Sequence, residues 1–416
     1  MTSFLFAQDI DKLINAKEAE RIEKILSSDA MEGRAIFTLG NDRAAAFIAN
    51  EFNTIGLEPW KAGGGYLQPF SLMRTGHVSA TATLDGTTID AANIIVISPD
   101  SSIKIDPSSG YEKGAIRAGD TLSRVASRFV QSGKNYVVLV DTSFSKTFPG
   151  LTRFKRQLFN TDKTVVFILT AVHPSRFSVE ARQEVTPGKL ANVVGILPGK
   201  SKKNEYVIFS GHYDHLGISK HPVNGDSIYN GANDDAAGTT AVIMLAKYFK
   251  AKGGNERTLV FAAFTGEESG GFGSHYFSRQ FNPATVMAMF NIEMIGTESK
   301  WGKNSAYITG YEKTDMGEIL EKNLQGSGFT FYPDPYKEQN LFYRSDNATL
   351  AMLGVPAHTI STSKMDNEPN YHKLSDEIQT LDMGNMAMII KAIAISSGTI
   401  VSGRDAPTRV NTSDLR

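Results

Sequence analysis

The sequence predicts an α/β fold: a mixed, largely parallel sheet sandwiched between helices, with a smaller α/β lobe inserted into it. Two observations predict this fold. After residue 186, apolar strands alternate with helices, which is typical of a sheet covered on both faces. Residues 73–185 differ, because their short β-like runs are separated by turns rich in Ser, Gly and Asp. We therefore expect a discontinuous main domain over 9–72 and 186–400, an inserted lobe over 73–185, and a C-terminal tail over 401–416.

The N-terminal part of the main domain is expected to contain two helices and a strand. Apolar residues at helical spacing indicate an amphipathic helix over 9–28. A second helix is expected over 42–55, ending at Gly56 because glycine readily takes the left-handed conformation that closes a helix. Tyr66–Leu72 has the composition of a strand.

In the lobe, we expect strands at Ile94–Ile97, Tyr136–Val140 and Thr164–Leu169, with helices near 121–131 and 151–158. The main domain then resumes with alternating elements. Its expected strands are Asn192–Leu197, Tyr206–Phe209, Leu259–Phe264, Val286–Ile292, 305–309 and Val355–Ile360, and its expected helices are Ala236–Ala251, 274–279, 314–325 and Met383–Ile395.

Composition excludes several classes of function. The 416 residues carry a formal net charge of −1 with both signs mixed, which argues against a nucleic-acid surface and against a polybasic membrane anchor. No apolar run reaches the roughly 18 residues of a membrane span. The chain contains no cysteine, so any metal must be held by His, Asp or Glu.

The extreme N-terminus is a short apolar segment, Met1–Gln8, before a polar helix. We interpret it as the remnant of a trimmed secretory signal, with a disordered end as the alternative. On this interpretation the protein is periplasmic or secreted.

Imidazole and carboxylate side chains follow the strands of the main domain. In an α/β sheet, ligands gather at the carboxyl ends of the strands. The residues at such positions, with one histidine from a later loop, are His212 and Asp214 after strand 206–209, Asp234 before helix 236–251, Glu267 and Glu268 after strand 259–264, Glu293 after strand 286–292, and His372.

These residue types suit a zinc site. Zinc binds imidazole nitrogen and carboxylate oxygen, and a catalytic site keeps one position open for water. Two zinc ions need a carboxylate that bridges them. A ligating histidine usually donates its other N–H to an oxygen nearby, and a carboxylate that does not bind metal can transfer protons.

Several motifs occur in a recognisable order: SDAMEGR (28–34), NVVGILPG (192–199), GHYDHLG (211–217), GANDDAAG (231–238), FTGEES (264–269) and YHKLSDE (371–377). With them, the chain resembles the M28 family of zinc aminopeptidases. The resemblance covers most of the chain outside the lobe, and the lobe stands where many relatives carry a protease-associated domain.

The resemblance implies a role for each candidate residue. It implies two Zn²⁺ ions per chain and a peptide substrate with a free N-terminus, hydrolysed by a metal-bound hydroxide. The roles are one zinc each on His212 and His372, a bridge by Asp234, completion of the His372 site by Glu268 and of the His212 site by Glu293, general acid–base catalysis by Glu267, and orientation of His212 by Asp214.

Two positions depart from the family pattern. Glu293 stands where members more often have Asp, and its extra methylene bears on the affinity and identity of the metal there. Asn347 replaces the histidine of a Ser-Asp-His motif, which leaves the role of that position open.

Several alternatives stay open. Asp235 competes with Asp234 as the bridge, and Asp376 supports His372 or is an acidic residue in the first turn of a helix. His215 is expected to line the cleft. The aromatic stretch 329–347 is either the wall of a substrate pocket or a packed loop.

The alternatives for function are a carboxypeptidase or glutaminyl cyclase of the same family, or a receptor-like binding protein without catalysis. The carboxypeptidases need an Arg-rich pocket, and only Arg344 stands near a cleft motif. The cyclases use one zinc, and the receptor-like relatives lose ligands, whereas the ligand set is complete here.

Overall fold

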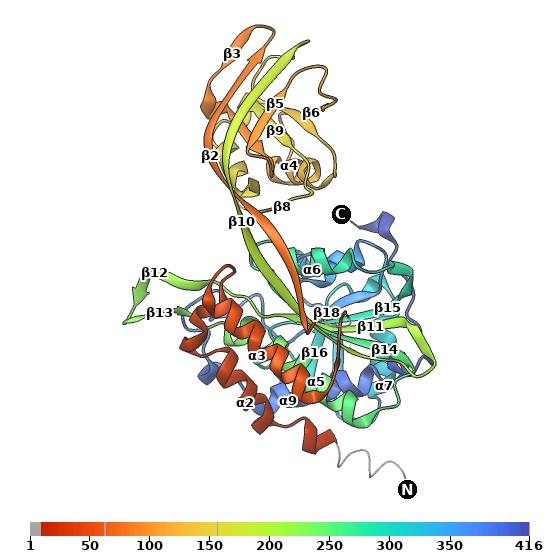
Figure 1. The fold of residues 1–416 in the computed structure, drawn as a ribbon. Coiled ribbons are helices and arrows are strands. Elements are labelled where there is room, and N and C mark those ends of the chain that lie inside the picture. Colours follow the sequence, from red (N-terminus) through yellow and green to blue (C-terminus); the bar gives the residue numbers. More distant parts are fainter. Residues whose placement is uncertain (1–9, 62–63, 156, 416) are drawn as a thin grey trace. The chain divides into compact units, whose positions relative to one another are not determined.

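A computed structural model describes residues 10–61, 64–155 and 157–415, which form two units (Figure 1). The first unit comprises the described residues up to Pro69 and from Ala191 onward, and the second spans Phe70–Leu190. Two long strands, β2 (Leu67–Leu84) and β10 (Phe177–Leu197), carry the chain from one unit into the other. The segment Met1–Gln8, interpreted above as a signal remnant, lies outside the described residues.

The expected helix over 9–28 is wrong as a single element. A first turn ends at Ile14, and helix α2 (Ala16–Leu26) begins after Asn15. The reason is local, because the Asn15 side chain accepts the backbone N–H of Glu18 at 3.0 Å and so caps a new helix. Helix α3 (Leu39–Ile55) begins earlier than expected, at the Thr38 cap, and ends at Gly56 in the left-handed conformation.

The sheet of the first unit confirms the predicted mixed, largely parallel fold. Its strands stand in the order β17-β16-β18-β15-β11-β14-β10. The central pairs β11–β14, β11–β15 and β15–β18 are parallel, as is the edge pair β16–β17, whereas β10–β14 and β16–β18 are antiparallel. The bounds are β11 Lys202–His212, β14 Arg257–Phe264, β15 Val286–Ile292, β16 Ser305–Ile308, β17 Thr330–Pro333 and β18 Ala357–Ser361.

Helices cover both faces of this sheet. On one face lie α2 and α3 with α5 (Ala237–Lys252), α7 (Met316–Leu324) and α9 (Met383–Ser396), and on the other lie α6 (Phe272–Ser278) and α8 (Asn347–Ala351). Because alternate residues of a strand point to opposite faces, neighbouring residues serve different cores. Phe209 belongs to the first core, where it stacks on Phe261 and Phe290, and Ile208 belongs to the second.

The first unit also contains a two-stranded hairpin of β12 (Gly217–Val223) and β13 (Asp226–Tyr229), the short strand β1 (Glu58–Pro59) and the short helix α10 (Gly398–Val401). The segment expected as a tail packs on this unit, since Arg409 donates to the carbonyls of Val286 and Pro283. Among the described residues, no helix combines the length and the apolar character needed to cross a bilayer.

The second unit has a four-stranded sheet of its own in the order β4-β9-β7-β6, with helix α4 (Leu122–Gln131). The expected helix over 151–158 is instead a 3₁₀ helix over Phe148–Lys155, which contains the helix-breaking pair Pro149–Gly150. The strands are β3 Thr87–Ile89, β4 Ile94–Ile97, β5 Ser102–Ile105, β6 Glu112–Ile116, β7 Tyr136–Val140, β8 Leu158–Phe159 and β9 Val165–Leu169.

Candidate metal centre

The central parallel strands bring the predicted site residues to one edge of the sheet. His212 is the last residue of β11, and it pairs with Phe264, the last residue of β14. Glu267 and Glu268 follow Phe264 after a short turn, and Glu293 follows the end of β15 directly. Strand ends in a common register therefore place these side chains side by side.

Asp234 lies between the two predicted histidines. Its Oδ1 is 3.3 Å from Nε2 of His212, and its Oδ2 is 3.2 Å from Nε2 of His372. Asp234 is buried, whereas His372 is about a third exposed, with its side chain at 37%. One carboxylate thus offers a separate oxygen to each histidine, which is the arrangement that a bridging ligand requires.

Each histidine also has a second carboxylate. Glu268 places Oε2 3.1 Å from Nε2 of His372. On the other side, the donor atoms of His212, Asp234 and Glu293 all lie within 4.8 Å of one another. The five predicted ligands therefore fall into two sets that share Asp234.

These donor sets fit zinc. A tetrahedral ion with bonds of about 2.0–2.1 Å spaces its ligand atoms about 3.3 Å apart. The separations of 3.1, 3.2 and 3.3 Å around Asp234 match that spacing, and nitrogen and carboxylate oxygen are the donors that zinc takes. Nε2 of His212 and Oδ2 of Asp234 are buried and have no hydrogen-bond partner in the protein, as expected of atoms kept for an ion.

Glu293 is held by a polar network. Its Oε2 accepts a hydrogen bond from the hydroxyl of Ser345, which in turn accepts from Nδ2 of Asn291 at 2.6 Å. Nδ2 of Asn291 also reaches Thr359, whose hydroxyl donates to Oδ1 of Asn347 at 2.8 Å. Asn347 therefore belongs to the hydrogen-bond network that holds Glu293 in place. Burial raises the pKa of Glu293 to about 7.

Asp214 lies between His212 and Glu267. The acceptor nearest to Nδ1 of His212 is the backbone oxygen of Asp214, at 3.1 Å, whereas the carboxylate oxygen Oδ1 is 3.7 Å away. That Oδ1 accepts the backbone N–H of Glu267 at 3.1 Å. Burial raises the pKa of Asp214 to about 6 and holds that of Glu267 well above its ordinary value. Oε2 of Glu267 lies 3.9 Å from Nε2 of His212, at the rim of the site.

Two aspartates that the sequence left ambiguous hold the backbone around Asp234. Asp235 is fully buried and accepts the backbone N–H groups of His212, Gly238 and Met294, so it joins three ligand-bearing segments. Asp376 accepts the N–H groups of Asn233 and Asp234, at 2.9 and 3.0 Å. Asp376 therefore supports the Asp234 loop.

Arg34 is a residue whose role sequence reasoning missed, although its motif, MEGR, was among those recognised. Its guanidinium is fully buried and donates to the carbonyls of Tyr213, Asn230, Gly231 and Leu26. These bonds tie the loop after His212 to the loop before Asp234.

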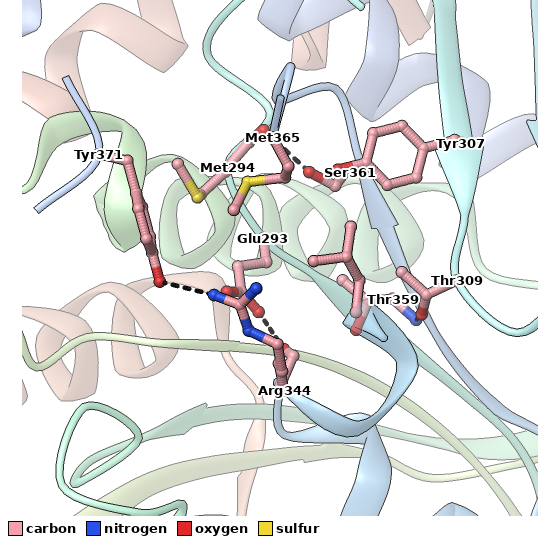
Figure 2. Close-up of a pocket in the computed structure, with 11 residues that line it drawn as sticks. Glu293, Met294, Tyr307, Thr309, Arg344, Thr359, Ser361, Met365 and Tyr371 are labelled. Atoms are coloured by element: carbon pink, nitrogen blue, oxygen red, sulfur yellow. Dashed lines mark hydrogen bonds between the residues drawn. The ribbon is translucent and has the colours of Figure 1, made fainter. Parts of the chain in front are cut away.

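A small pocket opens beside Glu293, lined by Met294, Tyr307, Met365, Tyr371 and Arg344 among others (Figure 2). Tyr371 stacks on the ring of His372 and accepts a long hydrogen bond of 3.4 Å from Arg344. From the aromatic stretch 329–347, only Leu341, Arg344 and Ser345 line the pocket, while Phe331, Tyr336 and Phe342 are buried. Most of that stretch is a packed loop.

Residues 192–396 match the sequence model of peptidase family M28. A protein of Pyrenophora teres f. teres (strain 0-1), named "Probable zinc metalloprotease", is 34% identical over 114 residues, which cover 27% of this chain and 24% of that protein. The match thus spans about a quarter of the length of that relative.

Solved structures share the fold. A zinc aminopeptidase from Bacillus subtilis is 16% identical, with a TM-score of 0.58 over 94% of this chain and 97% of that chain. An aminopeptidase from Aneurinibacillus sp. strain AM-1, also 16% identical, has a TM-score of 0.55 over 98% of this chain and 97% of the other. The segment that matches the family model contains all five residues of the two donor sets. Fold, site and sequence match agree, and the segment 192–396, which holds both donor sets, is a peptidase family M28 match.

Proposed function

We propose that this protein is a two-zinc aminopeptidase, which removes N-terminal residues from peptides. The observation that carries the proposal is Asp234, whose two oxygens face His212 and His372. Each histidine is joined by one further carboxylate, Glu293 or Glu268. Two sets of donors that share one carboxylate suit two ions and exceed what a single ion needs.

When bound, zinc would polarise the scissile carbonyl and lower the pKa of a water molecule. Glu267 is placed to handle the protons. Its backbone is fixed by Asp214 and its carboxylate stands at the rim of the site. A carboxylate placed beside the ions that does not bind them can take a proton from water and return it to a leaving amine.

The pocket beside Glu293 supports cleavage at a chain end. It begins next to the donor set of His212, and Tyr307, Met365 and Tyr371 are among the residues that line it (Figure 2). A residue whose side chain enters this pocket would hold its α-amine near the carboxylates of Glu268 and Glu293. A free amine is cationic and is attracted to these carboxylates, whereas an acetylated amine carries no charge and is not. From the interpretation of Met1–Gln8, we also propose that the protein acts outside the cytoplasm.

The test is a panel of aminoacyl-coumarin substrates beside the same substrates with acetylated N-termini, assayed with and without chelator. We expect hydrolysis of the free-amine substrates only, lost on chelation and restored by zinc. Glu267→Gln should retain two zinc ions but lose turnover by about 10²–10⁴-fold. The control is Glu338→Gln, at an exposed glutamate, which should change neither. Near wild-type turnover in Glu267→Gln would remove Glu267 as the base, and equal cleavage of acetylated substrates would refute the aminopeptidase.

A further inference from the structure

His215 is a second buried histidine in the loop that carries His212, and neither donor set of the proposed site uses it. It is 2% exposed. Its Nδ1 lies 2.7 Å from Oε1 of Glu268. A carboxylate only accepts hydrogen bonds, so Nδ1 carries the hydrogen and donates it. The contact is a short, charge-assisted hydrogen bond away from solvent, which is the strong kind.

This hydrogen bond gives the two carboxylate oxygens of Glu268 different partners. Oε1 is taken by His215, and Oε2 is left facing Nε2 of His372 at 3.1 Å. A glutamate has three rotatable side-chain bonds, and its two oxygens are otherwise equivalent. His215 therefore fixes both the rotamer of Glu268 and the oxygen that it presents to the Asp234–His372 side.

The imidazole of His215 is itself held in place. A methyl group on Gly231 would lie 2.5 Å from two carbons of the ring, so the ring packs where only glycine fits. The rings of Tyr229 and His372 stand edge-on to it at centroid distances of 6.5 and 5.9 Å. A ring enclosed in this way cannot turn to another partner without displacing its neighbours.

A different role for His215, as a ligand that binds the metal directly, is less consistent with the distances. Its donor atoms and those of Asp234 and Glu268 do lie within 4.8 Å of one another. However, ligand atoms on one zinc ion stand about 3.3 Å apart. The separation of 2.7 Å between Nδ1 of His215 and Oε1 of Glu268 is a hydrogen-bond length, whereas those around His372 are 3.1 and 3.2 Å. Nδ1 is therefore occupied by Glu268, and Nε2, which is buried without a hydrogen-bond partner, is the atom by which His215 would bind an ion if it did.

We propose that His215 is a positioning residue of the site formed by His372, Asp234 and Glu268, and that it sets the zinc affinity of this site without binding the ion. The proposal rests on the proposed two-zinc function. The loop from His212 to His215 then serves both sites, since the backbone oxygen of Asp214 holds His212 and the side chain of His215 holds Glu268.

The experiment compares two substitutions at this position. His215→Asn keeps an N–H donor near the place of Nδ1, and His215→Leu removes it. Zinc affinity is measured on the full chain by titration against a chromophoric chelator. We expect His215→Leu to weaken one of two sites by about 10–100-fold and to leave the other unchanged. His215→Asn should stay much closer to wild type. The matched control is His221→Leu, at an exposed histidine of β12, which should change neither site.

A double-mutant cycle tests whether His215 acts through Glu268. In a Glu268→Ala background, His215→Leu should weaken zinc binding no further. An additional 10-fold loss in that background would overturn the proposal, as would equal losses in the Leu and Asn variants or at both sites.

If His215→Leu does not fold, as judged by thermal unfolding of the chelator-treated protein, His215→Gln replaces it. Its amide reaches the place of Nε2 and misses that of Nδ1, so it should show the one-site loss. A wild-type protein that takes up one zinc ion refutes the two-zinc function. The proposal for His215 is then decided by whether the affinity of that ion shows the contrast between Leu and Asn.

Discussion

Glu23 predicts a dependence of stability on pH that can be worked out from its surroundings. It lies on α2 with no exposed surface, and its Oε2 accepts one hydrogen bond, from Thr240 at 2.9 Å. Its Oε1 has no hydrogen-bond partner in the protein. Burial raises the pKa of Glu23 from 4.5 to about 8, and the nearby charge of Arg34 offsets only part of that rise.

The sign follows from comparing the folded and unfolded chains. Between pH 4.5 and about 8, Glu23 keeps its proton in the folded protein and loses it in the unfolded one. The contribution of Glu23 to the free energy of unfolding is therefore fully present below pH 4.5. It is lost progressively as the pH rises from 4.5 through about 8. The free energy of unfolding should fall by about 1.4 kcal/mol per pH unit in this window, and by roughly 3–5 kcal/mol in total.

Glu23→Gln removes this dependence, because an amide resembles the protonated acid and does not titrate. Urea unfolding of both proteins in chelator at pH 5.5, 7.0 and 8.5 measures the difference. We expect similar stability near pH 5 and a growing advantage for Glu23→Gln above it. Glu20→Gln is the control, on the same helix with its side chain 46% exposed, and should show no such trend. A constant difference between Glu23→Gln and wild type across the three pH values would refute the reasoning.

Two further substitutions, Gly231→Ala with Gly225→Ala as its control and Asp376→Asn, test how the Asp234 segment is held. Gly231→Ala places a methyl group 2.3 Å from the backbone oxygen of Asp234, so it should lower stability and weaken zinc binding at both sites. Gly225→Ala, at a positive φ with nothing within 4 Å, should cost only about 1 kcal/mol in thermal unfolding and leave zinc binding unchanged. Asp376→Asn loses one of two acceptors for backbone N–H groups, so we expect it to cost about 1–3 kcal/mol and to weaken zinc binding in chelator competition. Unaltered zinc affinity in Asp376→Asn would show that the loop holds its shape without that carboxylate.

The fold, and the convergence of the candidate donor residues at one edge of the sheet, could be predicted because they leave local patterns in the sequence. Strand Val286–Ile292 is apolar except for Asn291, so its bounds and the position of Glu293 at its end follow from the residues alone. Sequence could not predict where strands such as β10 begin, because the 21 residues of β10 include polar positions that only its neighbours stabilise. The helix break at Asn15 was missed because its capping acceptor occurs within an otherwise regular apolar spacing.

The residues that hold the ligands could not be predicted for a different reason. His215 and Glu268 are 53 residues apart, and Asp376 and Asp234 are 142 residues apart. Neither pair has a spacing that marks it in a single sequence, and both depend on the completed fold. The role of Arg34 is harder still to predict from sequence, because its partners are backbone carbonyls, which any residue type would offer.

The proposed ligands therefore differ in which contacts fix their positions. His212 ends a strand with parallel partners on both sides, so the ladder of the sheet fixes its backbone. Asp234 stands in an irregular π-helical turn over Ala232–Ala236, and Glu268 and His372 stand in turns, so no ladder of the sheet reaches them. For Asp234 and Glu268, buried side chains take its place: Asp376 holds the backbone of the first and His215 holds the carboxylate of the second. We therefore expect substitution of Asp376 or His215 to change the zinc affinity although neither is a proposed ligand, because each fixes a proposed ligand that the sheet does not hold.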